Sequence, residues 1–200
     1  TLTAGIVADI GDNVQLSVDY WHIEITDMIS AENVRGALEE CFNPITNPTM
    51  SANYEACTII RRDPVSGQQS PYFVTYHNQA AIDTDGVDLQ LNWGRDVGPG
   101  LLNVNFLASI LGKMVTKTTP EDPGTDWKGS SGPGNLSGVQ NFQYEYRTFT
   151  TVGYNFGAWN MNLRWRHLPS IKHLQQVVLP SAPYVPTDSY DIFDFSGRYE

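Results

Sequence analysis

The sequence has no long apolar run and little positive charge. A helix that crosses a bilayer needs roughly 20 consecutive apolar residues, and no stretch of these 200 residues approaches that length. Twelve Lys and Arg residues stand against 22 Asp and Glu residues, so the net charge is −10. Proteins that hold nucleic acid carry a basic patch for the phosphate backbone. These absences exclude helical membrane spans and make nucleic acid an unexpected partner.

Residue patterns that mark catalytic and metal sites are also missing. A G-x-S-x-G motif is absent, and four histidines stand apart without a metal-ligand spacing: His22, His77, His167 and His173. Residues 83–88 offer carboxylates at calcium-loop spacing, but Val87 and Gly94 stand where that loop needs oxygen donors. Entry into a strand explains this stretch better. We therefore expect no enzymatic activity, no metal and no cofactor.

Cysteine is scarce, with two residues in the whole chain. Cys41 and Cys57 lie in a polar segment rich in Asn and Pro, not in an apolar run. We expect a disulfide that closes this loop, which implies an oxidising compartment, with two free thiols as the alternative.

What the sequence does contain is alternation of apolar and polar residues, the signal of a β-strand with two different faces. Residues 86–93 place Val87, Leu89, Leu91 and Trp93 on one face, and Asp88, Gln90 and Asn92 on the other. After Tyr20 the apolar phase shifts to Ile23 and Ile25, which indicates a bulge near Tyr20 and Trp21. We expect six strands, at about 14–25, 86–93, 102–111, 148–156, 159–166 and 191–199.

The connections between these runs alternate between long and short. Long connections cover about 27–81, 117–146 and 168–190, and short ones cover 94–100 and 157–159. Within the first long loop, Ser30 is a helix N-cap, and residues up to Phe42 have helical spacing, so we expect a short helix there. Residues 43–57 and 117–138 are rich in turn formers, and we expect neither helix nor strand in them.

Two architectures accommodate these patterns. Outer-membrane barrels have short turns on one side, long loops on the other, strands of about 9 to 11 residues and aromatic girdles. A soluble β-sandwich also alternates apolar and polar residues, and its interior could take up the aromatics. The sorted loop lengths favour the barrel.

Several short motifs stand in a characteristic order. They are LSVDYWHIEI from Leu16, RDPVSG from Arg62 after Cys57, NQAA and DGVD within 78–88, GLL at 100–102, Gly153-Tyr154, the run 159–166, and Tyr190 to Asp194. Their order and spacing resemble the C-terminal barrel region of TonB-dependent outer-membrane receptors, of the proteobacterial type with a cysteine-paired extracellular loop. The resemblance extends over nearly the whole chain.

This resemblance implies a Gram-negative outer-membrane protein with a barrel of about 22 strands and an N-terminal plug. Such a receptor imports a scarce ligand, such as a siderophore, a cobalamin-like cofactor or an oligosaccharide, with energy from TonB-ExbB-ExbD. Neither a plug, a TonB box nor a closing strand is present in the sequence. We therefore expect residues 1–200 to form part of an all-β, antiparallel transmembrane barrel, about six strands of it.

On the barrel reading, the polar parity faces the lumen, because an Arg on the lipid face costs about 2–4 kcal/mol at the bilayer midplane. The expected lumen-facing residues are Asp88, Gln90, Asn92, Arg164 and Arg166, with Arg147 near the outer end of the neighbouring strand. They would contact the plug or an anionic ligand. The expected residues in contact with lipid or in a girdle are Val87, Leu89, Leu91, Trp93, Trp159 and Trp165.

Two alternatives stay open at this stage. One is a soluble β-sandwich that binds carbohydrate by stacking exposed tryptophans on sugars. The other is a passive porin.

Overall fold

A computed structural model describes all residues except 32–33, 61–62, 64, 69–75, 119–121 and 134–141. The described residues divide into two compact units. The first unit comprises Thr1–Ile25, Ile82–Lys117 and Pro123–Glu200, and the second comprises Thr26–Ala81 and Thr118–Asp122.

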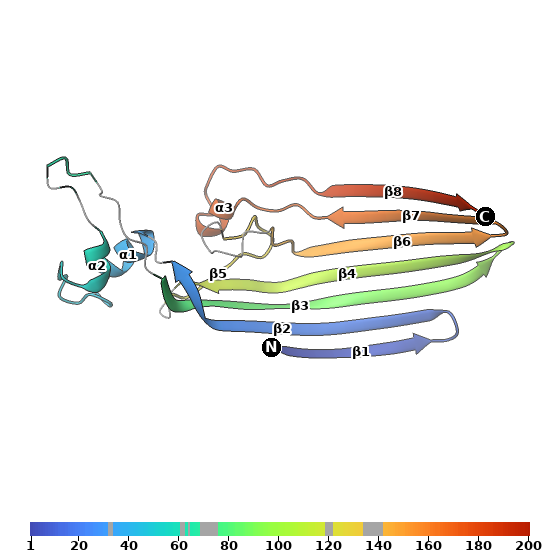
Figure 1. The fold of residues 1–200 in the computed structure, drawn as a ribbon, viewed down its shortest axis with the longest axis horizontal. Helices are drawn as coiled ribbons and strands as arrows, with labels where there is room; N and C mark the ends of the chain where they lie inside the picture. The colour runs from blue at the N-terminus through green and yellow to red at the C-terminus, as the bar shows by residue number, and fades with distance from the viewer. Residues whose placement is uncertain (32–33, 61–62, 64, 69–75, 119–121, 134–141) are drawn as a thin grey trace. The chain divides into compact units, whose positions relative to one another are not determined.

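The described strands form one sheet in which neighbours follow the order of the chain (Figure 1). Its strands are β1 (Leu2–Ile10), β2 (Val14–Ala31), β3 (Tyr76–Val97), β4 (Gly100–Lys117), β6 (Tyr146–Phe156), β7 (Trp159–Leu168) and β8 (Tyr190–Tyr199). A two-residue strand, β5 (Thr125–Asp126), pairs antiparallel with β4. This up-and-down antiparallel sheet confirms the predicted all-β meander.

Short turns join strands at one end of the sheet, and each contains a glycine with positive φ. Gly11 lies between β1 and β2, Gly98 between β3 and β4, and Gly157 between β6 and β7, with φ of 64°, 59° and 53°. Tight hairpin turns need this left-handed backbone, which glycine adopts without a steric penalty.

The sheet contains more strand than the alternation predicted. The pattern missed β1, where Val7 shares a face with Asp9, and it missed the outer parts of β2 and β3, which reach Ala31 and Tyr76. The prediction of no regular structure in 43–57 and 117–138 was also wrong. The helix α2 (Glu55–Ile59) begins in the first of these segments, and β5 lies in the second.

The predicted bulge near Tyr20 and Trp21 is wrong as well. The pairing of β2 with β1 runs without a break from Val14 to His22. Trp21 instead lies on the polar side of the sheet, over the site of Gly86, where an added Cβ would come 2.5 Å from Trp21 Cζ2. A large side chain fitted over a glycine therefore produces the apparent phase shift.

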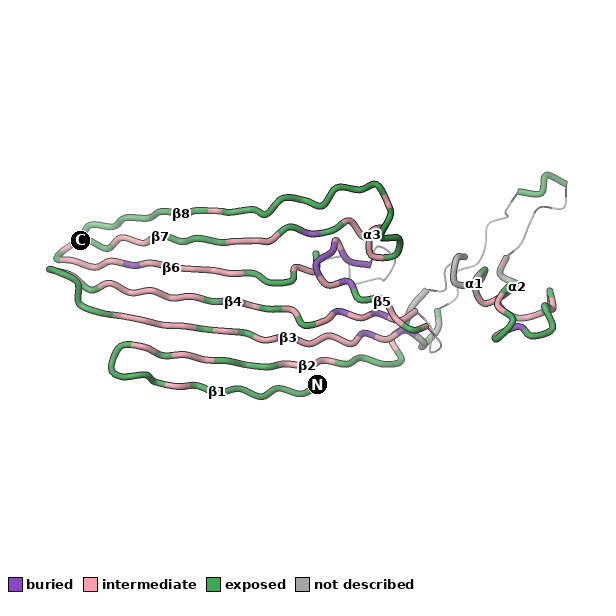
Figure 2. Tube along the Cα trace, turned by 180° about the vertical axis from the view of Figure 1, so that it is seen from behind, coloured by how far each residue is buried: buried purple, intermediate pink, exposed green. Residues whose placement is uncertain are grey.

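The sheet has one apolar and one polar face. In one row across four strands, Val104, Val152, Leu163 and Phe195 are registered neighbours. The apolar side chains are not covered, since Ile6 is 74% exposed, Leu163 43% and Phe195 71%. Figure 2 shows few buried residues along the strands and a group of them near β5.

This exposed apolar face rules out the β-sandwich alternative. A sandwich packs the apolar faces of two sheets together to form its core. The residues that the structure describes contain one sheet, and its apolar face has no second sheet against it.

Candidate functional site

A row of polar side chains crosses seven strands on what we call the polar face. Its members are Asp9, Gln15, Asn92, Asn105, Thr151, Arg164 and Asp194. Gln15 donates to Asp9 Oδ1 at 3.1 Å, Asn92 donates to Gln15 Oε1 at 3.3 Å, and Asn105 donates to Asn92 Oδ1. Four neighbouring strands thus satisfy one another's side chains through a continuous hydrogen-bonded ladder.

The β6 to β8 side of the polar face carries arginines. Arg164 lies opposite Asp194 in the register, and Arg166 Nη2 is 3.1 Å from Asp194 Oδ2. The Arg166 and Asp194 side chains are 48% and 54% exposed, so this ion pair contributes little to stability by itself. Its main effect is to orient Arg166.

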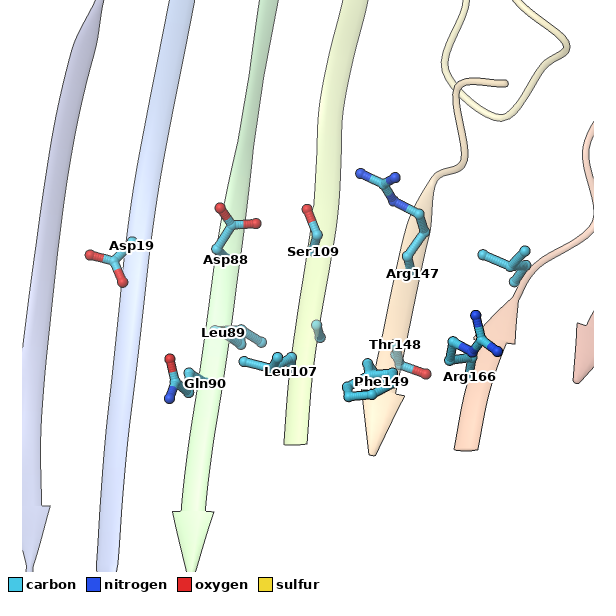
Figure 3. A pocket seen from close by; sticks show the side chains of 12 residues that line it. Asp19, Asp88, Leu89, Gln90, Leu107, Ser109, Arg147, Thr148, Phe149 and Arg166 are labelled. Atoms are coloured by element: carbon cyan, nitrogen blue, oxygen red, sulfur yellow. The ribbon is translucent and has the colours of Figure 1, made fainter. Parts of the chain in front are cut away.

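A shallow hollow of about 400 Å³ lies next to the ladder on the polar face (Figure 3). Asp19, Asp88, Ser109 and Arg147 lie along it on β2, β3, β4 and β6, respectively. Gln90, Arg166, Leu107 and Phe149 line it one rung away. We call this place the charged hollow.

The strand register brings these four side chains into one row. Gln15 contacts Asn92 and Trp21 contacts Gly86, which places Asp19 beside Asp88 on one of the two rungs between these contacts. Ser109 pairs with Arg147 in the β4–β6 ladder. In Figure 3, the Arg147 side chain extends from β6 toward β4.

Charge is unevenly distributed along this row. Asp19 and Asp88 are like charges on adjacent strands, an arrangement that costs about 0.2–1 kcal/mol in an antiparallel pair. The Ser17 hydroxyl donates to Asp19 Oδ2 at 2.6 Å, and Arg147 lies two strands from Asp88, roughly 10 Å away. Within the described residues, neither Asp88 nor Arg147 has a hydrogen-bond or ion-pair partner.

The register places the five polar residues singled out in the sequence on this same face. Asp88, Gln90 and Arg166 line the charged hollow, while Asn92 and Arg164 belong to the ladder row. Sequence reasoning did not connect Asp19 or Ser109 with them. The proximity of Asp19 depends on the pairing of β2 with β3 across a long loop, for which the sequence carries no local signal. Ser109 lies on β4, which a short turn joins to β3, so that turn was the available signal for its position near Asp88.

Aromatic side chains gather on the opposite, apolar face of β7 and β8. The ring centroids of Trp159 and Tyr199 are 4.9 Å apart, and the rings of Trp165 and Phe193 stack at 6.0 Å. The Trp165 indole donates to Asp191 Oδ1 at 2.7 Å. These rings therefore contact one another through their apolar carbon atoms, and the indole N–H of Trp165 has a hydrogen-bond acceptor.

The stretch 83–88 lies inside β3, as expected for entry into a strand. Its first carboxylate is already engaged: Asp83 Oδ1 is 2.8 Å from His22 Nε2, and Asp83 Oδ2 is 2.6 Å from Lys113 Nζ. Over the described part of the chain, no group of three or more His, Cys, Asp and Glu residues is arranged to hold a metal ion.

The second unit contains the disulfide between Cys41 and Cys57, whose Cα atoms are 4.9 Å apart. It joins α1 (Val34–Cys41), the helix predicted within the first long loop, to α2. The predicted N-cap is wrong, because Ser30 belongs to β2 and the helix begins only at Val34. Asn47 is 3% exposed and reinforces the bridge, since its Nδ2 donates to the carbonyls of Cys41 and Ser51 at 2.9 and 3.1 Å.

The same loop contains a second, smaller turn at Asp63. The Asp63 carboxylate accepts hydrogen bonds from the backbone N–H groups of Ser66 and Val65 and from the Ser66 hydroxyl, at 2.7, 2.9 and 3.0 Å. These donors stabilise the ionised form and lower the pKa of Asp63 below its ordinary value.

The two other long loops are joined to each other within the first unit. Lys172 N donates to Gly129 O at 2.8 Å, and Ser131 N donates to Lys172 O at 3.0 Å. The Ser131 hydroxyl accepts from the N–H of Leu174, the first residue of α3 (Leu174–Val178), at 2.9 Å. These contacts connect the β4–β6 loop to the β7–β8 loop.

A small core supports this junction. Trp127 and Ile171 are 7% and 4% exposed, and Ser130 is fully buried. Trp127 Nε1 donates to the hydroxyl of Thr116 on β4 at 2.7 Å, and Ser130 Oγ donates to Trp127 O at 2.6 Å. We call residues 123–133 and 169–188 the joined loops.

A single antiparallel sheet with one polar face and one exposed apolar face, with glycine turns at one end and long loops at the other, is a section of an outer-membrane type of β-barrel wall. The sheet is not closed. The chain belongs to the family described as TonB dependent receptor-like, beta-barrel, whose profile matches residues 1–200.

The solved structure of an iron transporter shows the same fold. The chain is 12% identical to the FrpB iron transporter (F5-1 variant) from Neisseria meningitidis in its apoprotein form, with a TM-score of 0.53. The matched region covers 99% of this chain and 23% of FrpB. It is 13% identical to the outer membrane transporter YddB from Escherichia coli, with a TM-score of 0.48, over 97% of this chain and 24% of YddB. The chain thus spans about a quarter of either transporter.

Among curated proteins, none matches this sequence. The described helices are all too short or too polar to cross a bilayer.

Proposed function

We propose that this chain is part of the barrel wall of an importer in the outer membrane of a Gram-negative bacterium. In this proposal the polar face lines a water-filled lumen and the apolar face contacts lipid. Val87, Leu89, Leu91 and Trp93 contact lipid on β3, and Trp159 and Trp165 do so on β7. The lumen side carries Asp88, Gln90, Asn92, Arg164 and Arg166.

The observation that carries this proposal is the polar row across seven strands. Asp9, Arg164 and Asp194 would be costly in hydrocarbon, where a lipid-facing Arg costs about 2–4 kcal/mol at the midplane. On the opposite face, the row that contains Leu163 and Phe195 is apolar and exposed. One face therefore suits water and the other suits lipid.

The further parts of the proposal follow from membership in the receptor family. The three long loops recognise a scarce ligand, of the siderophore, cobalamin-like or oligosaccharide class, and the complete protein draws energy from TonB-ExbB-ExbD. A plug domain, encoded outside these residues, contacts the polar face at Arg164 and Arg166 of β7. The chain contributes binding and passage, not catalysis. The Cys41–Cys57 bridge supports a location outside the reducing cytosol.

Thiol accessibility tests the assignment of the two faces. Single cysteines replace Asn162 or Leu163 on β7, and Asn92 or Leu91 on β3, in the full-length protein with its other free cysteines replaced. Cys41 and Cys57 are already bonded to each other and do not compete for reagent. In outer membranes, a charged water-soluble thiol reagent should modify N162C and N92C and leave L163C and L91C unmodified. Equal modification within each pair would overturn the assignment.

Ligand uptake tests the energy coupling. Cells that express the full-length protein should take up an iron siderophore, cobalamin or an oligosaccharide, and deletion of TonB should abolish that uptake. Uptake that persists without TonB would support the passive porin instead.

A further inference from the structure

The charged hollow leaves opposite charges without partners on the same wall. Asp19 and Asp88 lie side by side on β2 and β3, and Arg147 lies beyond Ser109 on β6. Two nearby charges on the polar face have partners, since Asp9 accepts from Gln15 and Arg166 contacts Asp194, whereas Arg164 lies opposite Asp194 without a hydrogen bond to it among the described residues. Over the described residues, Asp88 and Arg147 have no such partner.

We propose that the charged hollow binds a dipolar group. A ligand ammonium lies at the carboxylates of Asp19 and Asp88, a ligand carboxylate lies at the guanidinium of Arg147, and the Ser109 hydroxyl lies between them. The proposal rests on the proposed function, because solutes reach the hollow only when the polar face lines a water-filled lumen.

Strand geometry sets the size of this ligand. Two strand spacings of about 4.8 Å separate β3 from β6, so the backbones at Asp88 and Arg147 are roughly 10 Å apart. Arg147 extends toward β4 and shortens that gap (Figure 3). With a hydrogen bond at either end, a ligand whose charges are on the order of 6–8 Å apart fits the row.

A ligand with one charge suits the hollow less well. An anion at Arg147 would also face the two carboxylates, whose repulsion opposes its binding. A cation at Asp19 and Asp88 relieves their mutual repulsion but leaves Arg147 unpaired. Leu107 and Phe149, one rung away, provide an apolar surface for the carbon chain that connects the two charges of a dipolar ligand.

Protection of an engineered thiol tests the proposal. S109C is placed in the full-length protein, in outer membranes, with the other free cysteines replaced, and its reaction with N-ethylmaleimide is timed. The probe is Nα-acetyl-lysine, which carries an ε-ammonium and an α-carboxylate. Nα-acetyl-lysine amide carries only the cation, and N-acetylnorleucine carries only the anion on the same carbon skeleton.

Nα-acetyl-lysine should slow the S109C reaction, and the two single-charge analogues should slow it less than half as much. For a Kd on the order of 10 mM, a 50 mM probe lowers the free fraction about sixfold. D88N and R147Q, which remove one charge each at nearly constant shape, should both abolish the protection. Heat-modifiable migration on gels shows that each variant is folded.

N103C on the same strand and face is the matched control, six residues or about 20 Å away. Its reaction should be rapid and indifferent to all three probes. Two results would overturn the dipolar site and leave the lumen assignment standing. In one, N103C and S109C both react rapidly and no probe protects S109C selectively. In the other, S109C is inert while N103C reacts. If N103C is inert as well, the polar face does not line water, and the proposed function fails too.

Discussion

Substitution of Leu89 by Arg is the sharpest energetic test of the lipid-facing assignment. On the apolar face of β3, the stretch centred near Leu89 is bounded by two charged residues of the same parity, Asp85 and Arg95. Ten residues at about 3.4 Å give about 34 Å of strand, and a tilt of about 40° reduces this to about 26 Å. That height matches the apolar band of an outer-membrane barrel, about 25 Å. Leu89 then lies only about 3 Å from the midplane.

At that depth, Leu89→Arg should destabilise the full-length barrel by about 2–4 kcal/mol, a factor of about 30 to 900 in the folding equilibrium. Trp93→Arg, about 8 Å from the midplane, should cost less than Leu89→Arg, since the penalty falls to about 0–1 kcal/mol at the interfaces. Gln90→Arg is the matched control, because it adds the same side chain to the opposite face of the same strand.

The assay is guanidinium unfolding of the refolded full-length protein in lipid vesicles, followed by tryptophan fluorescence. Equal unfolding midpoints for Leu89→Arg and Gln90→Arg would contradict the assignment of lipid to the apolar face. A larger loss for Gln90→Arg would reverse it.

Three further changes probe the loops and the fit between strands. Cys57→Ser should destabilise the disulfide loop by about 3 kcal/mol, because the bridge closes a separation of 16 residues; unchanged limited proteolysis of that loop would contradict this. Gly86→Ala should lower the yield of heat-modifiable barrel by displacing Trp21, whereas Gly197→Ala, with its nearest atom at 4.0 Å, should not. Trp127→Phe should cost about 1 kcal/mol through its lost hydrogen bond and speed hydrogen exchange in the joined loops; unchanged exchange would count against their shared core.

Alternation in the sequence predicted the strands best where the two sides of the sheet differ in polarity. Residues 86–93 segregate completely, and they fall within β3. The upper part of β3, from Tyr76, has Asn78 and Asp83 mixed with Ala80 and Ile82, so no period of two emerges. A strand with no polarity difference between its faces gives no periodic signal.

The charged hollow could be predicted only in part. The parity of β3 and β7 indicated that Asp88 and Arg166 belong to polar faces. Which strands are adjacent, and at what register, depends on hydrogen bonds between segments far apart in the sequence. Asp19 and Arg147 became neighbours of Asp88 and Ser109 only through that register. The Trp21 error has the same origin, because the glycine that accommodates it lies on another strand.

The hydrogen bonds between Gly129, Ser131 and Lys172 also constrain how this surface can be engineered or can diversify. A graft of either loop alone onto another barrel would leave those backbone groups without partners. Both loops would have to be transplanted together, because each supplies hydrogen-bond partners for the other. The segment that contains Cys41 and Cys57 is closed by its own disulfide, so it can be exchanged without either of these loops.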